Sequence, residues 1–412
     1  MGTQQHNRHV IYILGWLLSC PIFATTGPLF NASMLGGNLQ VSTTIPGKTY
    51  SLSGVRIDTP GYSFTNPGSD CQLISNGYCI FSSSNTPANI GISGPPGAFS
   101  ATVAANGYAP VNLMQVAITG NRFLYVTGYY SPSNYPTLVC PIYTATGELG
   151  TCSVATQGFR AIKITINPAN TRAYLSLPDT NAVEVCSINR GTGALYNCIL
   201  AGTITSPAGM AFSSSGTQAY VITDEALGSI NQCSIDQTTG AFSACTNTGS
   251  LSPQLAYPTD ITLNPENTLA YVSNLNASLA ICQVEPSTGS VSNCSTQGTV
   301  PSTGGQYGQQ YVELNAAGDH LYLTNSYATA GTPNLYLCAL VDGIATGCTL
   351  TGALTTVQEQ GQLVLNSAGT QAYGSNTDLS LLSLCSVDSM GLLSQCHVTN
   401  SEVHEPTGMA IF

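Results

Sequence analysis

Charged residues are scarce in this chain, and patterns that predict helices are missing. Only 7% of the 412 residues are charged, with 8 basic and 19 acidic side chains. So few Lys and Arg residues exclude the basic footprint of a nucleic-acid-binding protein, and no block of like charges predicts an acidic interaction tail. No window shows sustained 3.6-residue hydrophobic periodicity, so we do not expect helix as the main element.

Glycine and proline are plentiful instead, with 42 Gly and 22 Pro. Short runs rich in Thr, Tyr, Val and Ile alternate with clusters of Gly, Asn, Ser and Pro. This alternation is typical of short strands joined by turns. The composition therefore predicts an all-β protein with an abundant polar, uncharged surface.

The N-terminus has the features of an export signal. Arg8 lies in a polar stretch before an apolar run that ends at a small residue, Ala24, so residues 1–24 are predicted to be a signal peptide cleaved after Ala24. Alternatively, "LLSC" is a lipoprotein signal that acylates Cys20, although Leu18 stands where a smaller residue is usual. No later stretch is apolar and long enough for a membrane span. Both interpretations place the protein outside the cytoplasm: secreted, periplasmic or on the cell surface.

The cysteines fall into close couples along the chain. Of 15 Cys, Cys20 belongs to the signal region, and the remaining fourteen form seven consecutive couples. Turn sequences such as "RGTGAL" lie between the members, so the two cysteines of each couple flank the turn of a β-hairpin. They face each other across two antiparallel strands, within reach of a disulfide. Metal binding is the alternative, but the spacing differs from C-x2-C and no His partners recur. We therefore predict hairpin disulfides in these couples: Cys71 and Cys79, Cys140 and Cys152, Cys186 and Cys198, Cys233 and Cys245, Cys282 and Cys294, Cys338 and Cys348, Cys385 and Cys396.

A repeated unit contains four short strand candidates in a fixed order. Residues 207–250 and 257–299 show it clearly: a first strand such as "TDITLN", a second such as "AYVSN", and one strand ending at each cysteine. The period is about 45 to 50 residues. This length and the four strands are typical of a β-propeller blade.

The second strands carry a family resemblance. "AYVSN", "LYLTN" and "LYVTG", preceded by "NPENT", "NAAGD" and "ITGNR", resemble YVTN-type β-propeller repeats, which are similar to the seven-bladed lactonase-like propellers. The resemblance covers residues 110–412 and implies the fold more strongly than a function. The chain departs from that family in carrying a cysteine couple in every blade.

Counting first strands gives seven, but only six are followed by the other three strands of a blade. The first strand nearest the C-terminus, residues 406–412, is therefore expected to form a seventh blade together with "KTYSLSGVRID" and the hairpin between Cys71 and Cys79. The ring would then close through both chain ends. The alternative makes residues 25–109 a separate small β domain beside a six-bladed ring. The first strands lie near residues 113–118, 161–166, 208–213, 259–264, 309–315, 360–366 and 406–412.

Aligned first strands predict which side chains surround the central channel. One column contains Gln115, Lys163, Gly209, Asp260, Tyr311, Gln362 and Gly408. Two residues later a column of mostly small residues contains Ala117, Thr165, Ala211, Thr262, Glu313, Val364 and Ala410. Because charges are rare, those around one end of the channel form a candidate binding site: Arg160, Lys163, Asp260, Glu313, Glu359, His404 and Glu405. The alternative is a ring of exposed or mutually paired groups at loop ends.

Catalytic signatures are weak. The sequence has no G-x-S-x-G elbow, H-E-x-x-H pair or phosphate loop, and only Glu313, Asp260 and His404 are candidates for hydrolytic chemistry. "DGIATG" and "SNTDLS" lack the ligand alternation of a calcium loop, so no metal and no cofactor is expected.

Three classes of function remain. The first is an exported, non-enzymatic scaffold, expected to be monomeric, that binds a protein or glycan partner. Its contacts would come from the channel mouth and from loops bearing Tyr129, Tyr130 and Tyr327, because aromatic residues are common in recognition surfaces. The second is a lactonase-like hydrolase, and the third is a structural surface protein.

Overall fold

The computed structural model describes most of the chain beyond the N-terminal segment. All structural statements below refer to residues 30–35, 38–43, 49–58, 63–64, 73–75, 78–86, 88–93, 97–106, 110–118, 123–128, 136–143, 146–156, 160–248, 255, 257–275, 278–297, 309–325, 335–351, 360–377, 379–401 and 403–412. The predicted signal peptide, residues 1–24, lies outside them.

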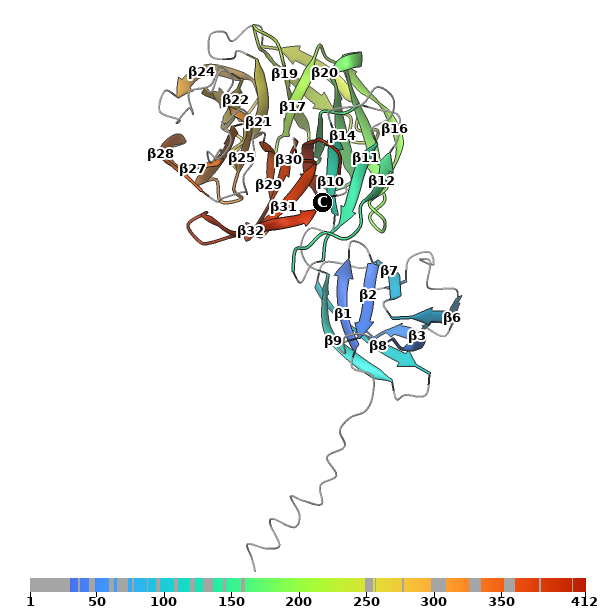
Figure 1. Ribbon diagram of the computed structural model, residues 1–412. Coiled ribbons are helices and arrows are strands. Elements are labelled where there is room, and N and C mark those ends of the chain that lie inside the picture. The colour runs from blue at the N-terminus through green and yellow to red at the C-terminus, as the bar shows by residue number, and fades with distance from the viewer. Residues whose placement is uncertain are drawn as a thin grey trace, which may run out of the picture.

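The described chain is built from antiparallel β-sheets, as the composition predicts (Figure 1). Seven sheets have four strands and one has five. The helix assignment within the described residues is the single 3-10 turn η1 (Pro178–Thr180), and these residues include no helix long and apolar enough to cross a membrane.

Six of the four-stranded sheets form the blades of a propeller. Blade 1 has β10 (Phe123–Gly128), β11 (Thr137–Pro141), β12 (Ser153–Thr156) and β33 (Pro406–Ile411). Blade 2 has β13 (Lys163–Ile166), β14 (Arg172–Leu177), β15 (Ala182–Ile188) and β16 (Leu195–Thr203). Blade 3 has β17 (Pro207–Phe212), β18 (Gln218–Thr223), β19 (Ile230–Ile235) and β20 (Phe242–Asn247).

The other three blades follow the same order. Blade 4 has β21 (Pro258–Leu263), β22 (Leu269–Asn274), β23 (Leu279–Val284) and β24 (Val291–Gln297). Blade 5 has β25 (Gln309–Leu314), β26 (His320–Asn325), β27 (Leu335–Val341) and β28 (Ile344–Leu350). Blade 6 has β29 (Gln360–Leu365), β30 (Gln371–Asn376), β31 (Leu381–Val387) and β32 (Leu393–Asn400).

The inner strands close into a ring around a central channel. β13, β17, β21, β25, β29 and β33 each contact the next, and β33 contacts β13. β33, from the C-terminus, pairs with β10 and completes blade 1, with Tyr125 opposite Ala410. The predicted propeller of four-stranded blades is confirmed, and its ring has the six-bladed form given above as the alternative.

The predicted closure through residues 48–58 and the Cys71 hairpin is corrected by this pairing. Residues 113–118 were counted as the first strand of a blade, but they belong to β9 (Val111–Ile118), which pairs with β8 of the N-terminal region. The inner position of blade 1 is therefore taken by β33. Consequently β33 completes a blade without pairing with strands from the N-terminal region.

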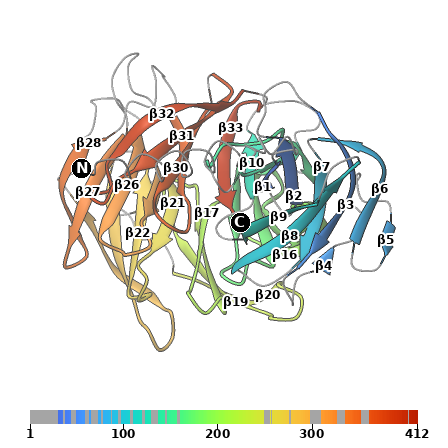
Figure 2. The same ribbon diagram turned by 90° about the horizontal axis from the view of Figure 1, so that it is seen from below.

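The N-terminal strands form two sheets of their own, beside the ring in Figures 1 and 2. Their hydrophobic core consists of residues between Phe30 and Ala105, without a side chain from the blades. Cys79 is disulfide-bonded, and its predicted partner Cys71 lies outside the described residues. The strands are β1 (Phe30–Leu35), β2 (Asn38–Thr43), β3 (Ser51–Ile57), β4 (Ser63–Phe64), β5 (Leu73–Ser75), β6 (Tyr78–Asn85), β7 (Ala88–Ser93) and β8 (Gly97–Ala105), with β9 at one edge.

The recurrent turn between the first and second strands is capped by its own asparagine. In "NPENT", Asn264 Oδ1 accepts hydrogen bonds from the backbone N–H groups of Thr268 and Leu269, both at 2.8 Å. Asn167 and Asn366 cap the equivalent turns of blades 2 and 6. The fourth turn residue has positive φ, as at Asn267 (56°), which favours Gly or Asn.

The buried tyrosine of the second strand connects neighbouring blades. Tyr322 Oη donates to the carbonyl of Gly391 at 2.7 Å, in the cysteine hairpin of the next blade. Equivalent bonds at 2.7 to 3.1 Å join Tyr125 to Gly193, Tyr174 to Gly240, Tyr271 to Gly343, and Tyr373 to Gly147. In blade 3, Tyr220 donates to Gln218, whose amide donates to Thr288 of blade 4. We call these contacts the tyrosine clasps; they run around the whole ring.

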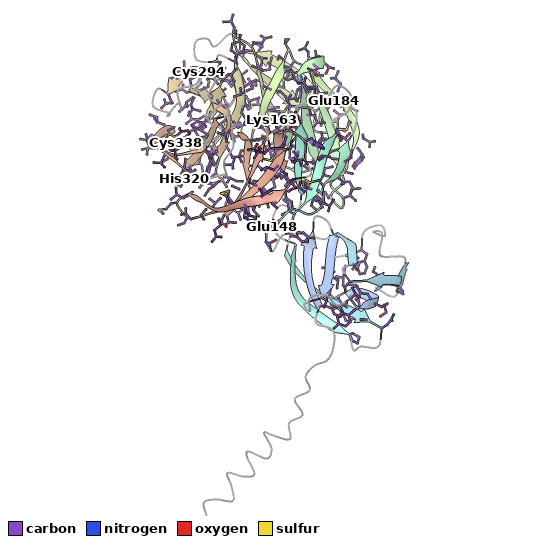
Figure 3. The ribbon with its side chains drawn as sticks, viewed as in Figure 1. Glu148, Lys163, Glu184, Cys294, His320 and Cys338 are labelled. Carbon is purple, nitrogen blue, oxygen red and sulfur yellow. A yellow bond between two sulfur atoms is a disulfide. The ribbon has the colours of Figure 1, made fainter. Side chains whose placement is uncertain are left out.

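Each blade carries the predicted hairpin disulfide between its two outer strands. Cys233 lies opposite Cys245 in the pairing of β19 with β20, and Figure 3 shows Cys294 and Cys338 on the rim of the ring. The six bridges join Cys140 to Cys152, Cys186 to Cys198, Cys233 to Cys245, Cys282 to Cys294, Cys338 to Cys348, and Cys385 to Cys396.

A single tyrosine clasp can be tested by removing one hydroxyl. Tyr322→Phe leaves the buried carbonyl of Gly391 without its donor, so we expect the free energy of unfolding to fall by about 1 to 2 kcal/mol. Urea denaturation with the disulfides intact measures the loss. Tyr336→Phe is the control, because Tyr336 is buried in β27 and its hydroxyl bonds to no described residue. Equal effects of both substitutions would contradict a role for the clasp.

Candidate functional site

The inner strands turn their first-column residues into the channel at local irregularities. The register between first and second strands shifts between Pro258 and Asp260 in blade 4, and at the equivalent place in blades 3, 5 and 6. Bulges of this kind redirect side chains and are common beside functional sites. Ser273, two residues after the tyrosine of β22, donates to the carbonyl of Asp260 at 3.4 Å. Thr127 and Ser375 make the equivalent bonds in blades 1 and 6.

An ion pair spans the channel at this level. Lys163 Nζ on β13 lies 2.7 Å from Asp260 Oδ2 on β21, and their side chains are 6% and 3% exposed. The ammonium group also lies 4.9 Å from the centre of the Tyr311 ring, and the backbone N–H of Val312 donates to Asp260 Oδ2 at 3.5 Å. Burial raises the pKa of Asp260, and the Lys163 ammonium opposes that increase by stabilising the carboxylate.

Two glycines leave the space that this pair occupies. Gly209 of β17 lies between the partners in the order of blades, and a Cβ atom there would lie 2.6 Å from Cα and Oδ1 of Asp260. A Cβ atom at Gly408 of β33 would lie 2.8 Å from Cα of Lys163. Both glycines belong to the same column as the charged partners, so Lys163 has a glycine on each neighbouring inner strand and Asp260 has one on β17.

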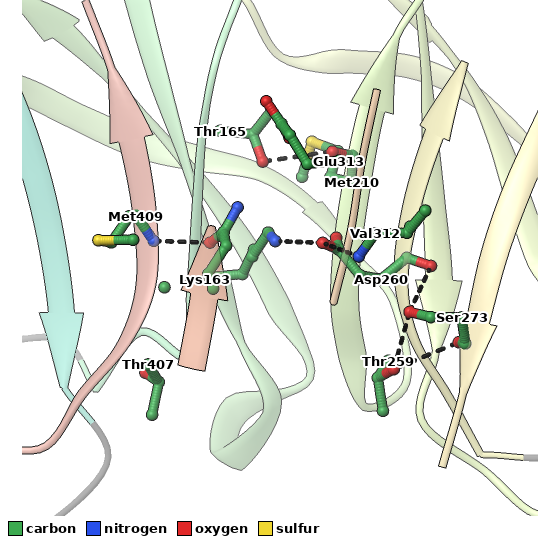
Figure 4. Close-up of polar contacts among 12 residues, drawn as sticks. Lys163, Thr165, Met210, Thr259, Asp260, Ser273, Val312, Glu313, Thr407 and Met409 are labelled. Atoms are coloured by element: carbon green, nitrogen blue, oxygen red, sulfur yellow. Dashed lines mark hydrogen bonds and ion pairs between the residues drawn. The ribbon is translucent and has the colours of Figure 1, made fainter. Parts of the chain in front are cut away.

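A cavity of about 360 Å³ extends from the ion pair to the asparagine-capped turns. Its walls include Thr165, Thr262 and Glu313 of the second column, and the far end includes Pro168 and Asn267 in the turns. Figure 4 shows Thr165 and Glu313 on one side of the Lys163–Asp260 pair and Thr259 and Thr407 on the other. The pair therefore forms the floor of a pocket within the ring.

Glu313 has an unusual electrostatic environment. Burial raises its pKa to about 8, and the charge of Asp260 adds to the increase. The backbone N–H of Leu365 donates to Oε1 at 3.4 Å, while Oε2 bonds to no described residue. At neutral pH this carboxyl group is mostly protonated and can donate a hydrogen bond into the cavity.

The predicted site residues separate into two groups. Lys163, Asp260 and Glu313 lie together in the channel. Arg160 instead pairs with Asp179, where both side chains reach solvent, because it precedes β13 at the end of the ring away from the cavity. His404 and Glu405 precede β33 and are not among the residues that line the cavity, so the cavity does not bring His404 together with Glu313 and Asp260. Glu359, Tyr129, Tyr130 and Tyr327 lie outside the described residues.

Two cavity residues were in the predicted columns but were not chosen for the site. Gln362 Oε1 accepts from the backbone N–H of Met409 at 2.7 Å, whereas its Nε2 has no partner among the described residues. The Thr262 hydroxyl is likewise free of described partners and lines the cavity. Their positions in the two aligned columns could have identified them, but the site prediction considered charged residues first. Within the described chain, His, Cys, Asp and Glu form no group of three that could hold a metal ion.

Glu313 makes stability depend on pH. Between the ordinary carboxyl pKa and about 8, the folded protein keeps a proton that the unfolded chain has lost, so stability falls as pH rises through this window. Glu313→Gln cannot lose a proton. We therefore expect the variant to gain stability over the wild type between pH 5 and pH 8, by at most about 1.4 kcal/mol per pH unit.

Urea denaturation of both proteins at several pH values measures this difference. The exposed Glu266→Gln is the matched control and should keep the wild-type slope. Parallel pH profiles for the wild type and Glu313→Gln would refute the assignment.

Solved structures share the fold of this chain. A candidate 6-phosphogluconolactonase from Bacteroides uniformis is 13% identical, with a TM-score of 0.52, over 71% of this chain and 100% of that one. A periplasmic gluconolactonase from Pseudomonas aeruginosa is 12% identical, with a TM-score of 0.52, over 70% and 98%. A chain of a nidogen/laminin complex is 12% identical, with a TM-score of 0.53, over 71% and 98%.

Neither a protein-family model nor a curated protein matches the sequence. At such low identities the structural likenesses establish a propeller fold and leave the activity open. The predicted resemblance to β-propellers is thus supported, whereas no family model of YVTN-type repeats matches the chain.

Proposed function

We propose that this protein is an exported scaffold whose channel binds a neutral, hydroxyl-bearing ligand such as the end of a glycan. The observation that carries the proposal is the pocket above the Lys163–Asp260 pair, in which polar groups with free hydrogen-bonding capacity face a cavity of about 360 Å³. Several disulfides are typical of proteins outside the cytoplasm, which agrees with the predicted export signal.

The free polar groups come from four blades. Lys163 has N–H groups beyond the one directed to Asp260, and the Gln362 Nε2 group has no described partner. The Thr262 hydroxyl can donate or accept, and the protonated Glu313 can do both. A sugar presents donors and acceptors around its whole ring, so groups that converge from four sides match it better than a single polar patch.

Apolar side chains supply the other half of the pocket wall. Met210, Phe212 and Met409 line the cavity together with Pro168 and Pro265. Ligand pockets commonly combine apolar walls with a few placed polar groups, and this volume lies near the lower end of their range. A small sugar, with apolar C–H faces and polar edges, suits this combination.

The charges of the pocket favour an uncharged ligand. Lys163 is the one cation among the described lining residues, and its ammonium is engaged by Asp260. Glu313 is mostly neutral at pH 7 because of its raised pKa. A ligand with a phosphate or carboxylate group would thus meet no uncompensated positive charge.

A lactonase-like hydrolase is the second candidate. Its support is the partly buried carboxyl of Glu313, whose pKa of about 8 suits proton transfer near neutral pH, together with the fold shared with a gluconolactonase. Asp260 is a poor base for this chemistry because it is held by Lys163. Wild-type protein without activity on a panel of sugar lactones, or with unchanged activity in Glu313→Gln, would eliminate this candidate.

Calorimetric titration with neutral monosaccharides and disaccharides tests the binding function. We expect the wild type to bind at least one of them. Thr262→Val and Gln362→Leu should each weaken binding about tenfold, since one hydrogen bond contributes roughly 1 kcal/mol or somewhat more. Thr296→Val, on the exposed edge strand β24, is the control and should bind as the wild type does.

Two results would argue against the proposal. One is a folded wild-type protein that binds none of the sugars. The other is equal affinity of the wild type, Thr262→Val and Gln362→Leu, which would place the ligand elsewhere on the protein, for example on the loops.

A further inference from the structure

We propose that the Lys163–Asp260 pair sets the charge preference of the channel: Asp260 neutralises Lys163, so that the pocket accepts neutral ligands and rejects anions. This inference rests on the proposed binding function and names its specificity-determining residues. It predicts that removing either partner makes the pocket bind ions of the same sign as the side chain that was removed: anions without Asp260, and cations without Lys163.

The pair is built into the ring. Its partners come from blades 2 and 4 and are 97 residues apart in sequence. Gly209, on the strand between them, leaves the space that Asp260 fills, and Gly408 leaves the space beside Lys163. The cation lies over the Tyr311 ring, and Val312 donates to the carboxylate. Four residues of the surrounding strands thus accommodate one ion pair.

Stability alone gives little reason for this arrangement. Removing two charges from water costs about as much as their attraction returns, and well-packed apolar residues often replace a buried pair without loss of stability. This chain has few charged residues, 7% of the total. Two of them nevertheless meet at the floor of the cavity, where their fields act on whatever enters.

The charge balance of the pocket follows from three side chains. Among the described lining residues, the charged types are Lys163, Asp260 and Glu313. With the first two paired and Glu313 protonated, the pocket is close to neutral. Without Asp260 the ammonium faces the cavity uncompensated, and without Lys163 the remaining carboxyl groups make the pocket acidic.

Two single variants and their combination test this inference. Asp260→Asn should bind inorganic phosphate at least tenfold more tightly than the wild type at pH 6.5. Lys163→Met should likewise gain at least tenfold in affinity for methylammonium. The double variant Lys163→Met/Asp260→Asn carries neither charge and should show neither gain. Calorimetry measures the affinities, and thermal melting verifies that each protein is folded.

A folded Asp260→Asn protein without the phosphate gain would overturn the inference, as would a gain that persists in the double variant. If Asp260→Asn fails to fold, the response of Lys163→Met to methylammonium decides. Failure of the proposed function looks different, because it appears as absent binding of neutral sugars to the wild type. The ion measurements do not depend on that result.

Discussion

A buried tyrosine on the second strand of each blade holds that blade to the next, and the geometry of the ring depends on this repeated contact. In five blades the hydroxyl donates directly to a glycine carbonyl in the neighbouring cysteine hairpin, as Tyr322 does to Gly391, and in blade 3 Gln218 relays the contact. The glycine is needed because its φ is positive, 78° at Gly391, and a Cβ atom at Gly391 would also lie 3.0 Å from the Tyr322 hydroxyl. The disulfide then fixes the hairpin that presents this carbonyl.

The same strand also supports the channel. In three blades, Ser or Thr two residues after the tyrosine donates to the carbonyl of the first-column residue on the inner strand, as Ser273 does at Asp260 and Ser375 at Gln362. The tyrosine therefore sets the distance to the next blade, while the hydroxyl beside it stabilises the irregular backbone that directs first-column side chains inward. One short motif thus connects the scaffold with the site, because both contacts depend on the position of a single strand.

Local features of the fold were predictable from the sequence, and long-range pairing was not. Alternating strands, hairpin cysteines and the two channel columns depend on neighbours within one repeat, so their spacing identifies them. The seven-bladed closure was not the arrangement found, because residues 113–118 have the pattern of a first strand but pair with β8 outside the ring. In the site, the inward position of Lys163, Asp260 and Glu313 followed from their columns. That Lys163 joins Asp260 depends on which blades meet. That Arg160 joins Asp179 away from the cavity depends on how the segments before β13 and after β14 lie within blade 2.

The channel combines free hydrogen-bonding groups with little net charge, and this limits which ligands the proposed site would accept. An ionic ligand would need an oppositely charged side chain, and Lys163 and Asp260 are already paired with each other. A neutral ligand needs only groups whose hydrogen bonds to water can be replaced by hydrogen bonds to the ligand. Thr262, Gln362 and Glu313 have that capacity, since each has an atom without a described partner beside the cavity. Burial, which keeps Glu313 protonated, also strengthens such bonds, because competing water is limited. Burial inside the ring thus raises the free-energy cost of a charge, and it also makes the hydrogen bonds to a ligand selective.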